Sequence, residues 1–474
     1  MKQKITFKLI TLTISLLIII SLSSCTKPRG TIENAIAIGF NNNQIYLLNT
    51  EGQELLLEGY DYIQEQFDEY MIVRQNNLYG YINSRGEEII KPCFTLAYPM
   101  KENLAVVVKD NVYQIIDSSN NVLYVFPNDI SSSSYFSDNR LVVCKNEKYG
   151  YLKYTPEKNN FELPETFDFD YALPFSEGFA VVGIETIIEN NTGPNETSIR
   201  YNYLTLKNKL LFDEYLFETA SSFHEGLGKV GVTETVTIAG VNSANKETGR
   251  TRTEDIYVYR YVNYKGEYLI DRINRSVLTT HYGTDASDGI ITTAIYKYRD
   301  SSSVENDYYK SYTFYTISGL TIYDGCFQYT AKGINVFWPT NVLSLGNRHL
   351  FASAVQSVSW NYYLADESFE EFFTIDIDIK VEDLWVSDLA TKYSTSPKMI
   401  RTILKTPFYM SNLKSIVYND AKAILSICQV SLGDEGLYGM VMLTYNEQED
   451  YQDSPTYGYH AKYIILPKYQ RIIY

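Results

Sequence analysis

A short pattern that returns along the chain constrains the fold more than any other feature of the sequence. The stretch LYGYINSRGEEIIKP, residues 78–92, places two tyrosines around a glycine, then a polar turn, then an apolar run that ends at Lys-Pro. Short alternating runs bounded by turn residues are typical of β-strands. Related segments are YGYLKYTP (149–156), YNYLTLKN (201–208), YRYVNYKG (259–266) and YTFYTISG (312–319).

A second recurring element precedes these segments. It opens with an acidic or polar residue, passes in most copies through Gly or Asn, and ends in an apolar run. Successive copies start 33 to 63 residues apart, and a period in this range is typical of stacked or radially arranged supersecondary units. The copies are ENAIAI (33–38), EYMIVR (69–74), ENLAVV (102–107), DNRLVV (138–143), EGFAVV (177–182), EGLGKV (225–230), DGIITT (288–293) and, more weakly, KGINVF (332–337).

The positions of the clearest copy each have a physical reason. Tyr79 and Tyr81 alternate along a strand, so their side chains can face a neighbouring sheet. Gly80 permits the close approach of a backbone or ring, and Gly86 suits a turn with positive φ. Pro92 ends the hydrogen bonding of the return strand. We interpret these residues as core and turn positions rather than ligand-binding groups.

Each unit also carries a small residue followed three positions later by a large one. Such pairs let successive sheets approach each other while they fill one core. The pairs are Ala97 and Met100, Ala172 and Phe175, and Ala220 and Phe223.

Together these features resemble a known bacterial repeat. An aromatic-Gly-Tyr-Ile strand, a Gly-Glu-x-Ile-Ile-x-Pro turn and strand, an Ala-x-x-Phe segment and a Glu-Gly-Leu-Ala-Val strand make the chain similar to the WG-containing repeat. The resemblance covers about residues 33–340 and is clearest at 79–107 and 149–182, with Tyr79 and Tyr149 where the family usually has Trp. It implies a β-rich repeat array, usually with no assigned enzymatic activity.

We predict an all-β repeat architecture, β-propeller-like, with irregular blades and extended hairpins. Radial closure would protect strand edges that an open array leaves unpaired. An open β-solenoid or a stacked-hairpin array is the alternative. The eight leading motifs fit seven or eight units, and the interval from 225 to 288 has room for one more.

Three polar insertions interrupt the later units, at residues 190–198, 242–254 and 299–307. Alternating strands flank each insertion, which predicts three extended hairpins. These hairpins could form a binding surface, or they could be solvated loops without a binding role. Tyrosines favour binding, because they supply contact area at low entropic cost, although they also suit β-ribbons structurally. These tyrosines are Tyr257, Tyr259, Tyr261, Tyr296, Tyr298, Tyr308 and Tyr309.

The repeat fades in the C-terminal region, residues 341–474. We expect this region to be β-rich, to contain one short helix, and to complete or cap the array. The segment TIDIDIKVEDLWV (374–386) predicts a strand with Asp376, Asp378, Lys380 and Glu382 on its wet face. Calcium binding there is a weak alternative, since no glycine turn accompanies the carboxylates. Ser396 and Pro397 begin the predicted helix, over 394–404.

The N-terminal segment has the features of an export signal. Residues 1–24 begin with lysines, continue as a short apolar run and end in Leu-Ser-Ser before Cys25. An uncleaved membrane anchor is the alternative, although a permanent span needs about 20 apolar residues. The junction resembles the lipobox of bacterial lipoproteins, which implies that Cys25 carries a diacylglycerol group and that 25–32 is a short linker. Because Thr26 rather than Asp follows Cys25, outer-membrane or cell-surface placement is permitted.

The charge of the chain bears on its partners. Removal of the three lysines in residues 1–24 changes the formal net charge from −16 to −19. Nucleic-acid backbones bind through Lys and Arg, so we expect no nucleic-acid partner. Anionic lipids would also repel the chain, so membrane attachment should rest on the acyl chains.

No recognisable catalytic or metal motif occurs in the sequence. Cys93, Cys144, Cys326 and Cys428 are far apart, which favours buried thiols over a disulfide or a metal site. The four histidines have no ligand neighbour at suitable spacing, and no nucleophile elbow, P-loop or Rossmann fingerprint appears. We expect neither enzyme activity nor a cofactor. The carboxylate pairs that a glycosidase could use are Asp168/Asp170 and Glu370/Glu371.

Two functional hypotheses follow from these features. In the first, the chain is a non-catalytic interaction module of the bacterial cell envelope whose loops or ribbons bind an envelope or host protein. In the second, its tyrosine-rich surface binds polysaccharide by ring stacking, with or without hydrolysis.

Overall fold

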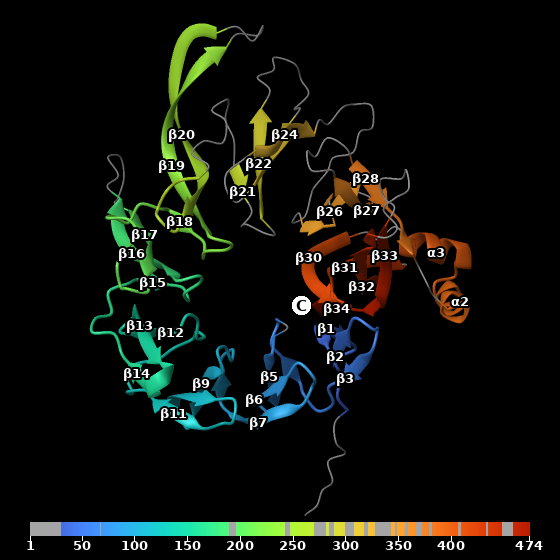
Figure 1. Ribbon diagram of the computed structural model, residues 1–474, viewed down its shortest axis with the longest axis horizontal. Helices are drawn as coiled ribbons and strands as arrows, with labels where there is room; N and C mark the ends of the chain where they lie inside the picture. The colour runs from blue at the N-terminus through green and yellow to red at the C-terminus, as the bar shows by residue number, and fades with distance from the viewer. Residues whose placement is uncertain are drawn as a thin grey trace, which may run out of the picture.

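The protein forms small sheets that are set around a central space (Figure 1), and all described strand pairs are antiparallel except the short parallel pair of the ninth sheet. The computed structural model describes residues 30–66, 68–188, 196–241, 247–269, 281–283, 289–298, 308–316, 321–327, 343–346, 348–355, 359–365, 372–378, 382–405, 409–432, 435–447 and 458–474. Within them lie nine sheets, more than the seven or eight units that the leading motifs predict.

The first five sheets come from the N-terminal half of the chain. In spatial order, the first sheet has β3 (Glu54–Leu56), β2 (Gln44–Asn49), β1 (Ala35–Asn41) and the C-terminal strand β34 (Arg471–Ile473), and the second has β4 (Tyr62–Ile63), β5 (Tyr70–Gln75), β6 (Leu78–Asn83) and β7 (Glu88–Phe94). The third sheet has β8 (Leu96–Ala97), β9 (Leu104–Lys109), β10 (Val112–Asp117) and β11 (Val122–Val125). The fourth has β12 (Arg140–Lys145), β13 (Lys148–Thr155) and β14 (Asn160–Glu162), and the fifth has β15 (Tyr171–Ala172), β16 (Phe179–Ile188) and β17 (Glu196–Thr205).

The remaining four sheets follow in chain order. Their strands are β18 (Thr219–Ala220), β19 (Leu227–Val241) and β20 (Glu247–Asn263); β21 (His281–Gly283), β22 (Ile290–Tyr298), β23 (Tyr308–Thr316) and β24 (Thr321–Phe327); β25 (Leu343–Leu345), β26 (Arg348–Val355), β27 (Ser359–Ala365) and β28 (Phe372–Ile375); and β29 (Ile377–Asp378), β33 (Tyr459–Tyr469), β32 (Glu435–Tyr445), β31 (Ala421–Leu432) and β30 (Tyr409–Tyr418). A 3₁₀ turn spans Pro156–Lys158.

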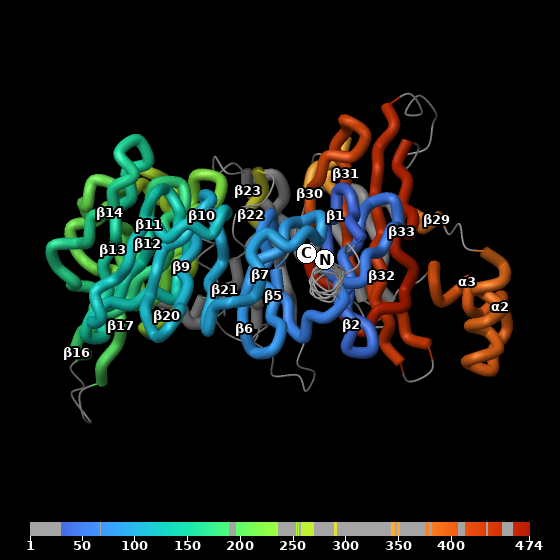
Figure 2. The backbone as a smooth tube through the Cα atoms, turned by 90° about the horizontal axis from the view of Figure 1, so that it is seen from below, coloured from blue at the N-terminus to red at the C-terminus, as the bar shows by residue number. Residues whose placement is uncertain are grey.

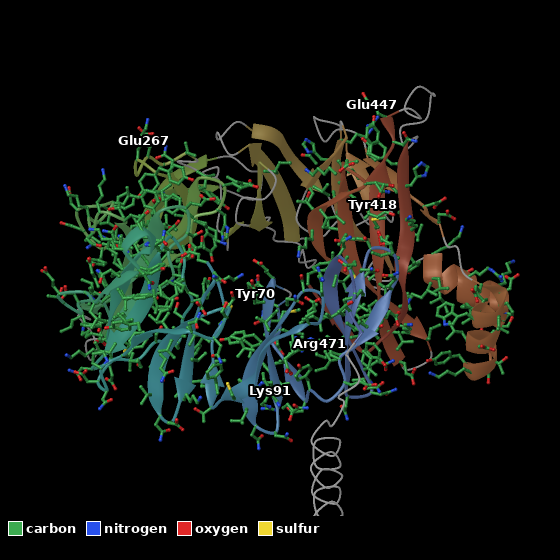
Figure 3. All side chains as sticks on the ribbon, turned by 60° about the horizontal axis from the view of Figure 1, so that its bottom comes forward. Tyr70, Lys91, Glu267, Tyr418, Glu447 and Arg471 are labelled. Carbon is green, nitrogen blue, oxygen red and sulfur yellow. The ribbon has the colours of Figure 1, made fainter. Side chains whose placement is uncertain are left out.

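The two recurring sequence elements form adjacent strands of one sheet. In the second sheet, the leading motif at 69–74 supplies β5 and the aromatic motif supplies β6, which pair in register from Tyr70↔Asn83 to Gln75↔Leu78. Figure 3 shows Tyr70 of β5 toward the central space and Lys91 of β7 on the outer side. The strands and the turn predicted at 78–92 are therefore confirmed, but the prediction that Pro92 ends the return strand is wrong. The register shifts near Pro92, and β7 pairs again at Tyr79↔Phe94.

The core lies between consecutive sheets rather than within one sheet. One cluster joins Ile72 and Tyr81 of the second sheet to Ala105, Val107 and Ile116 of the third. The small-then-large pairs lie at these boundaries: the large members are buried, with Met100 and Phe175 each 2% exposed and Phe223 fully covered. A single sheet has no such core of its own, so neighbouring sheets must shield one another.

A buried tyrosine fastens each of several sheets to the next one. The hydroxyl of Tyr81 donates a hydrogen bond to the carbonyl of Tyr98 at 2.7 Å. The same position in later copies does the same: Tyr151 donates to the Leu173 carbonyl at 2.8 Å and Tyr203 to the Ser221 carbonyl at 2.9 Å. Each acceptor directly follows the small residue of an Ala-x-x-large pair. We call these contacts the tyrosine ties.

The glycine inside the aromatic motif allows the outer strand to approach. A Cβ atom at Gly80 would lie 2.4 Å from the carbonyl oxygen of Ile90 on β7. No side chain fits at that distance, so the close approach predicted for Gly80 is confirmed.

Three consecutive hairpins in the fifth to seventh sheets extend beyond the common strand length, as the insertions predict. Strands β30 to β33 of the ninth sheet, with ten to twelve residues each, are also long. The long inner strands β5, β9 and β12 have six residues each, whereas β16 has ten, β19 fifteen and β22 nine. At about 3.3 Å per residue, the overhang is roughly 10 to 30 Å. The hairpins β16–β17, β19–β20 and β22–β23, here called the ribbons, pair antiparallel along their lengths, and Figure 1 shows β19–β20 running far out of the body.

The two ends of the chain meet in the first sheet. The C-terminal strand β34 pairs antiparallel with β1, from Ile38↔Ile473 to Phe40↔Arg471. A core cluster joins Ala37 and Leu48 of the first sheet to Leu425 and Met442 of the ninth. The first and ninth sheets therefore lie side by side, although they are far apart in the sequence. The all-β repeat architecture is confirmed.

The C-terminal region differs from the prediction in its helices. A strand was predicted over 374–386, but β29 ends at Asp378 and α2 (Asp383–Lys392) begins at Asp383. Two helices are present, because α3 (Pro397–Lys405) also forms where a helix was predicted. Val386 of α2 and Ile400 of α3 are buried together against Val430 of β31. This packing stabilises a helix where the alternating apolar and polar residues predict a strand.

The predicted wet face of the 374–386 strand exists only over its first half. Asp376 and Asp378 are exposed, and Ile375 and Ile377 are buried. Lys380 lies outside the described residues, and Glu382 is the residue before α2 rather than a strand residue. Among the described helices, none is long and apolar enough to cross a membrane.

The tyrosine ties predict a specific loss of stability. Tyr81→Phe removes the hydroxyl and leaves the buried Tyr98 carbonyl without this donor, so the free energy of unfolding should fall by about 1–3 kcal/mol. Denaturant unfolding followed by circular dichroism measures the change. Tyr149→Phe is the matched control: Tyr149 is half-buried at the neighbouring motif position, and its loss should stay within about 0.5 kcal/mol. Equal losses in the two variants would contradict the role of the tie.

Candidate functional site

Tight two-residue turns mark one end of the sheets. Each turn precedes a long inner strand, and both of its residues have positive φ, for example 53° at Glu177 and 86° at Gly178. The flanking residues bond to each other through their backbones, as Ser176 and Phe179 do at 2.8 and 3.1 Å. We call this end the rim end. Its rim turns are Glu102–Asn103, Asp138–Asn139, Glu177–Gly178 and Glu225–Gly226.

The leading acidic residue of each rim turn reaches the next rim turn. The Glu102 carboxylate accepts a hydrogen bond from the Asn139 N–H at 3.0 Å, and Asp138 accepts one from the Gly178 N–H at 2.8 Å. Glu225 in turn accepts one from the Gly289 N–H at 2.8 Å. At these rim turns, the acidic residue that opens the motif is therefore a link between neighbouring sheets.

Glu177 makes the most complete of these links. Its two oxygens accept from the N–H groups of Glu225 and Gly226 and from the hydroxyl of Tyr264, all at 2.8 Å. The Tyr264 ring is 47% exposed and stacks at 5.4 Å on Phe179. Burial alone would raise the pKa of Glu177, but the Gly226, Tyr264 and Glu225 donors hold it below its usual value.

The opposite end of the sheets carries the ribbons. In the sixth sheet, Leu227↔Asn263 lies next to a rim turn and Val241↔Glu247 lies at the far end of the same pair of strands. The strands of the fifth sheet run in the same way, from Phe179↔Thr205 to Ile188↔Glu196. Figure 2 shows the β16–β17 hairpin at one side of the molecule and β14 toward the other. We call this end the ribbon end.

Aromatic and charged side chains gather where the ribbons leave the body. Tyr257 and Tyr259 of β20 meet edge to face at 5.3 Å, and the Lys229 ammonium lies 5.7 Å from the centre of the Tyr259 ring. The Tyr257 hydroxyl is 2.5 Å from Thr219 Oγ1. These residues are half-buried or exposed, so they form a surface. We call Thr219, Lys229, Tyr257 and Tyr259, with Arg200 and Glu218, the ribbon base.

An ion pair fixes the neighbouring ribbon to the ribbon base. Arg200 of β17 lies 2.9 Å from Glu218, whose carboxylate also accepts a hydrogen bond from the Thr233 hydroxyl at 2.8 Å. Burial raises the pKa of Glu218, but the hydrogen bonds from Arg200 and Thr233 outweigh it and the pKa is lowered. Beyond this point Ile187 of β16 is 69% exposed. An exposed isoleucine on a ribbon is suited to contact with another macromolecule.

The ribbon tyrosines predicted from the sequence divide into three groups. Tyr257 and Tyr259 lie on the ribbon base, whereas Tyr261 is 1% exposed and belongs to the core between the sixth and seventh sheets. The backbones at 296, 298, 308 and 309 pair in β22–β23. The side chains of Tyr296, Tyr298, Tyr308 and Tyr309 lie outside the described residues.

The other sequence candidates do not assemble into one site. Cys25 and residues 1–24 lie outside the described residues, as do Glu370 and Glu371. Asp168 bonds to Thr166. Asp170 bonds to Lys148 at 2.5 Å and accepts from the Glu185 N–H at 2.9 Å, so its carboxylate holds strands together. Within the described part of the chain, no group of three His, Cys, Asp or Glu side chains could hold a metal ion.

The cysteines and histidines are likewise dispersed. Cys93, Cys144 and Cys428 are free, and burial raises the pKa of the Cys428 thiol to about 12. Cys428 is the buried thiol expected from the sequence, while Cys93 and Cys144 are half-buried. The histidines lie at separate places: His224 before a rim turn, His281 in β21, His349 in β26 and His460 in β33.

The carboxylate links give a pH-dependent prediction. A carboxylate whose pKa is lowered in the folded state stabilises the protein above its unfolded pKa of about 4.3, and this contribution disappears as the pH falls through the folded value. Glu177→Gln should therefore cost about 1 kcal/mol at pH 7, reduced from larger values by solvent screening, and progressively less below about pH 4.3. Denaturant midpoints between pH 7 and pH 3.5 test it.

The control for this variant is Glu165→Gln. Glu165 is exposed on a loop, and its loss should leave the midpoint unchanged at every pH. A difference between wild type and the Glu177 variant that does not change with pH would contradict the charge-based link.

Comparison with solved structures finds likenesses of low identity. The crystal structure of the tricorn protease has 9% identity and a TM-score of 0.31, over 86% of this chain and 44% of that one. A post-proline cleaving enzyme from Rickettsia typhi has 9% identity and a TM-score of 0.30, over 86% and 58%. Puromycin hydrolase has 10% identity and a TM-score of 0.26, over 85% and 60%. The chain therefore spans about half of their lengths, and at these TM-scores no argument about function follows.

No curated protein matches the chain. The family model described as WG containing repeat matches residues 79–113 and 166–185. These stretches cover β6 to the start of β10, with the first tyrosine tie, and the segment from the end of the fourth sheet into β16. In these two stretches the recurring unit of strand, tie and rim turn therefore matches the WG-containing repeat.

Proposed function

We propose that this protein is an exported, lipid-anchored, non-catalytic binding module of the bacterial cell envelope. Its ribbon end would bind another protein, from the envelope or from a host. The observation that carries the proposal is the row of three consecutive ribbons, which extend past the common strand length in the fifth, sixth and seventh sheets. Such an overhang is not needed to complete the sheets, because the third and fourth sheets do without it.

The chemistry of the ribbon base supports a protein partner. Tyrosine and arginine often contribute much of the binding energy of protein interfaces, and apolar residues such as an exposed isoleucine suit the apolar centre of an interface. The alternative partner is a polysaccharide bound by ring stacking. Tyr257 and Tyr259 meet edge to face, and Tyr171 and Tyr201 do the same at 5.2 Å. Edge-to-face rings offer no pair of parallel open faces to a sugar, which favours the protein partner.

The engagement of the acidic side chains supports a non-catalytic role. Glu177, Glu225, Asp170 and Glu218 each accept hydrogen bonds from the protein itself. A general acid or nucleophile must instead present its carboxyl group to a substrate. Attachment through acyl chains on Cys25 would place the module at the outer membrane or the cell surface.

Trimming the ribbons tests the binding function. Replacing residues 185–199 and 233–257 by Asn-Gly turns keeps the last common pairs, Ile184↔Arg200 and Val232↔Val258, and restores six-residue strands. The trimmed protein should keep its β-rich circular dichroism spectrum but lose the partner in a pull-down from solubilised envelopes or host extracts, identified by mass spectrometry against the wild-type protein.

The matched control replaces only Asp110-Asn111, the turn of an ordinary hairpin, by Asn-Gly. This variant should retain the partner. Retention of every partner by a folded, trimmed protein would contradict the role of the ribbons. Binding of wild-type protein to defined glycans on an array, or release of reducing sugars, would favour the polysaccharide alternative.

The lipid anchor has its own test. The thiol of Cys25 is the only nucleophile at the junction that can carry the diacylglycerol, so Cys25→Ser should abolish incorporation of labelled palmitate and leave uncleaved precursor. The serine hydroxyl is a weaker nucleophile than a thiolate. Cys93→Ser is the control and should be acylated normally. Labelled palmitate in the Cys25 variant would refute the anchor.

A further inference from the structure

We propose that the rim end of the molecule lies against the membrane and that the ribbon end projects away from it as the binding face. The inference rests on the proposed lipid anchor at Cys25. It specifies the orientation of the anchored molecule relative to the membrane, and therefore which of its two ends a partner can reach.

The first described residues are fastened at the rim end. The Ile32 N–H donates to the Arg85 carbonyl at 3.1 Å, and the Asn49 side chain donates to the Glu33 carbonyl at 3.0 Å. Arg85 belongs to the turn between β6 and β7, and the neighbouring Ser84 N–H donates to the Glu69 carbonyl at 3.0 Å, directly before β5. The chain therefore enters the body beside the turns that precede the long inner strands.

The tether to the lipid is short. Four residues lie between Cys25 and Gly30, and the five residue-to-residue steps of an extended chain span at most about 18 Å. The Gly30 position, next to the Leu55 side chain of β3, must then lie within this distance of the acylated cysteine. The rim end on this side of the ring is thus held close to the lipid headgroups.

The inverted orientation does not fit this reach. Six-residue strands make the sheets about 20 Å deep, and Figure 1 shows the β19–β20 ribbon running outward from the body. With the ribbon end against the membrane, the tether would have to cover at least the depth of a sheet. That distance exceeds the reach of about 18 Å, so the ribbons must point away from or along the membrane.

The surface chemistry of the rim end suits contact with headgroups but not insertion. Its acidic residues are occupied by backbone donors, as at Glu102 and Asp138, and basic residues such as Lys207 and Lys265 are exposed on the neighbouring turns. A surface of this kind rests beside a bilayer while the acyl chains hold it.

Spin labels on two ends of one sheet test the orientation in the full-length acylated protein. Ser119→Cys places a label on the exposed β10–β11 turn at the rim end, and Lys109→Cys places one on the exposed end of β9 at the ribbon end. Ile187→Cys adds a ribbon position. The protein is reconstituted in phosphatidylcholine vesicles that contain a nickel-chelating lipid. Three native cysteines are replaced by serine in this background: Cys93, Cys144 and Cys326.

Relaxation of each label by headgroup-bound nickel is then compared with its relaxation by soluble nickel chelate. The ratio should be highest at position 119, lower at 109 and lowest at 187. Equal ratios or the reverse order, in protein that is acylated and bound to vesicles, would overturn the orientation and leave the anchor intact. Absence of acylation and of vesicle binding in wild-type protein would overturn the anchor and the orientation together.

Discussion

The hydrogen bond from a buried tyrosine to a carbonyl of the next sheet is the interaction on which this fold depends. The buried Tyr81 hydroxyl donates to the Tyr98 carbonyl, and burial raises its pKa. An unpaired hydroxyl and carbonyl in that position would each cost about 1–3 kcal/mol. The tie therefore fixes the distance and register between two sheets, and its repetition at Tyr151 and Tyr203 sets the spacing of the ring.

The two ends of the sheets are specialised in different ways. At the rim end, the carboxylates of the rim turns bind within the protein, because they accept N–H groups of the next turn. At the ribbon end, strands continue past the core and leave tyrosines and an isoleucine on the surface. In a chain with a formal charge of −16, backbone N–H dipoles therefore stabilise the carboxylates at the rim end.

Much of the repeat could be predicted from the sequence, because a hairpin is a local structure. The strands around Gly80, the turn at Gly86 and the extended hairpins all follow from patterns within about 15 residues. The role of Glu177 was missed, although its acidic residue type recurs at the head of each motif; its partners lie 48 and 49 positions away. Helix α2 was missed because its packing partner Val430 is equally remote. Contacts of this kind depend on the assembled ring.

The central claim is that one sheet cannot fold without the neighbour that completes its core and accepts its tyrosine. Amide hydrogen exchange on a fragment of residues 60–94, which contains only β4 to β7, measures this directly beside the whole protein. The account predicts that amides of β6 exchange in the fragment at the rate of an unfolded chain, while the same amides are strongly protected in the intact ring. Comparable protection of β6 in the isolated fragment would contradict it.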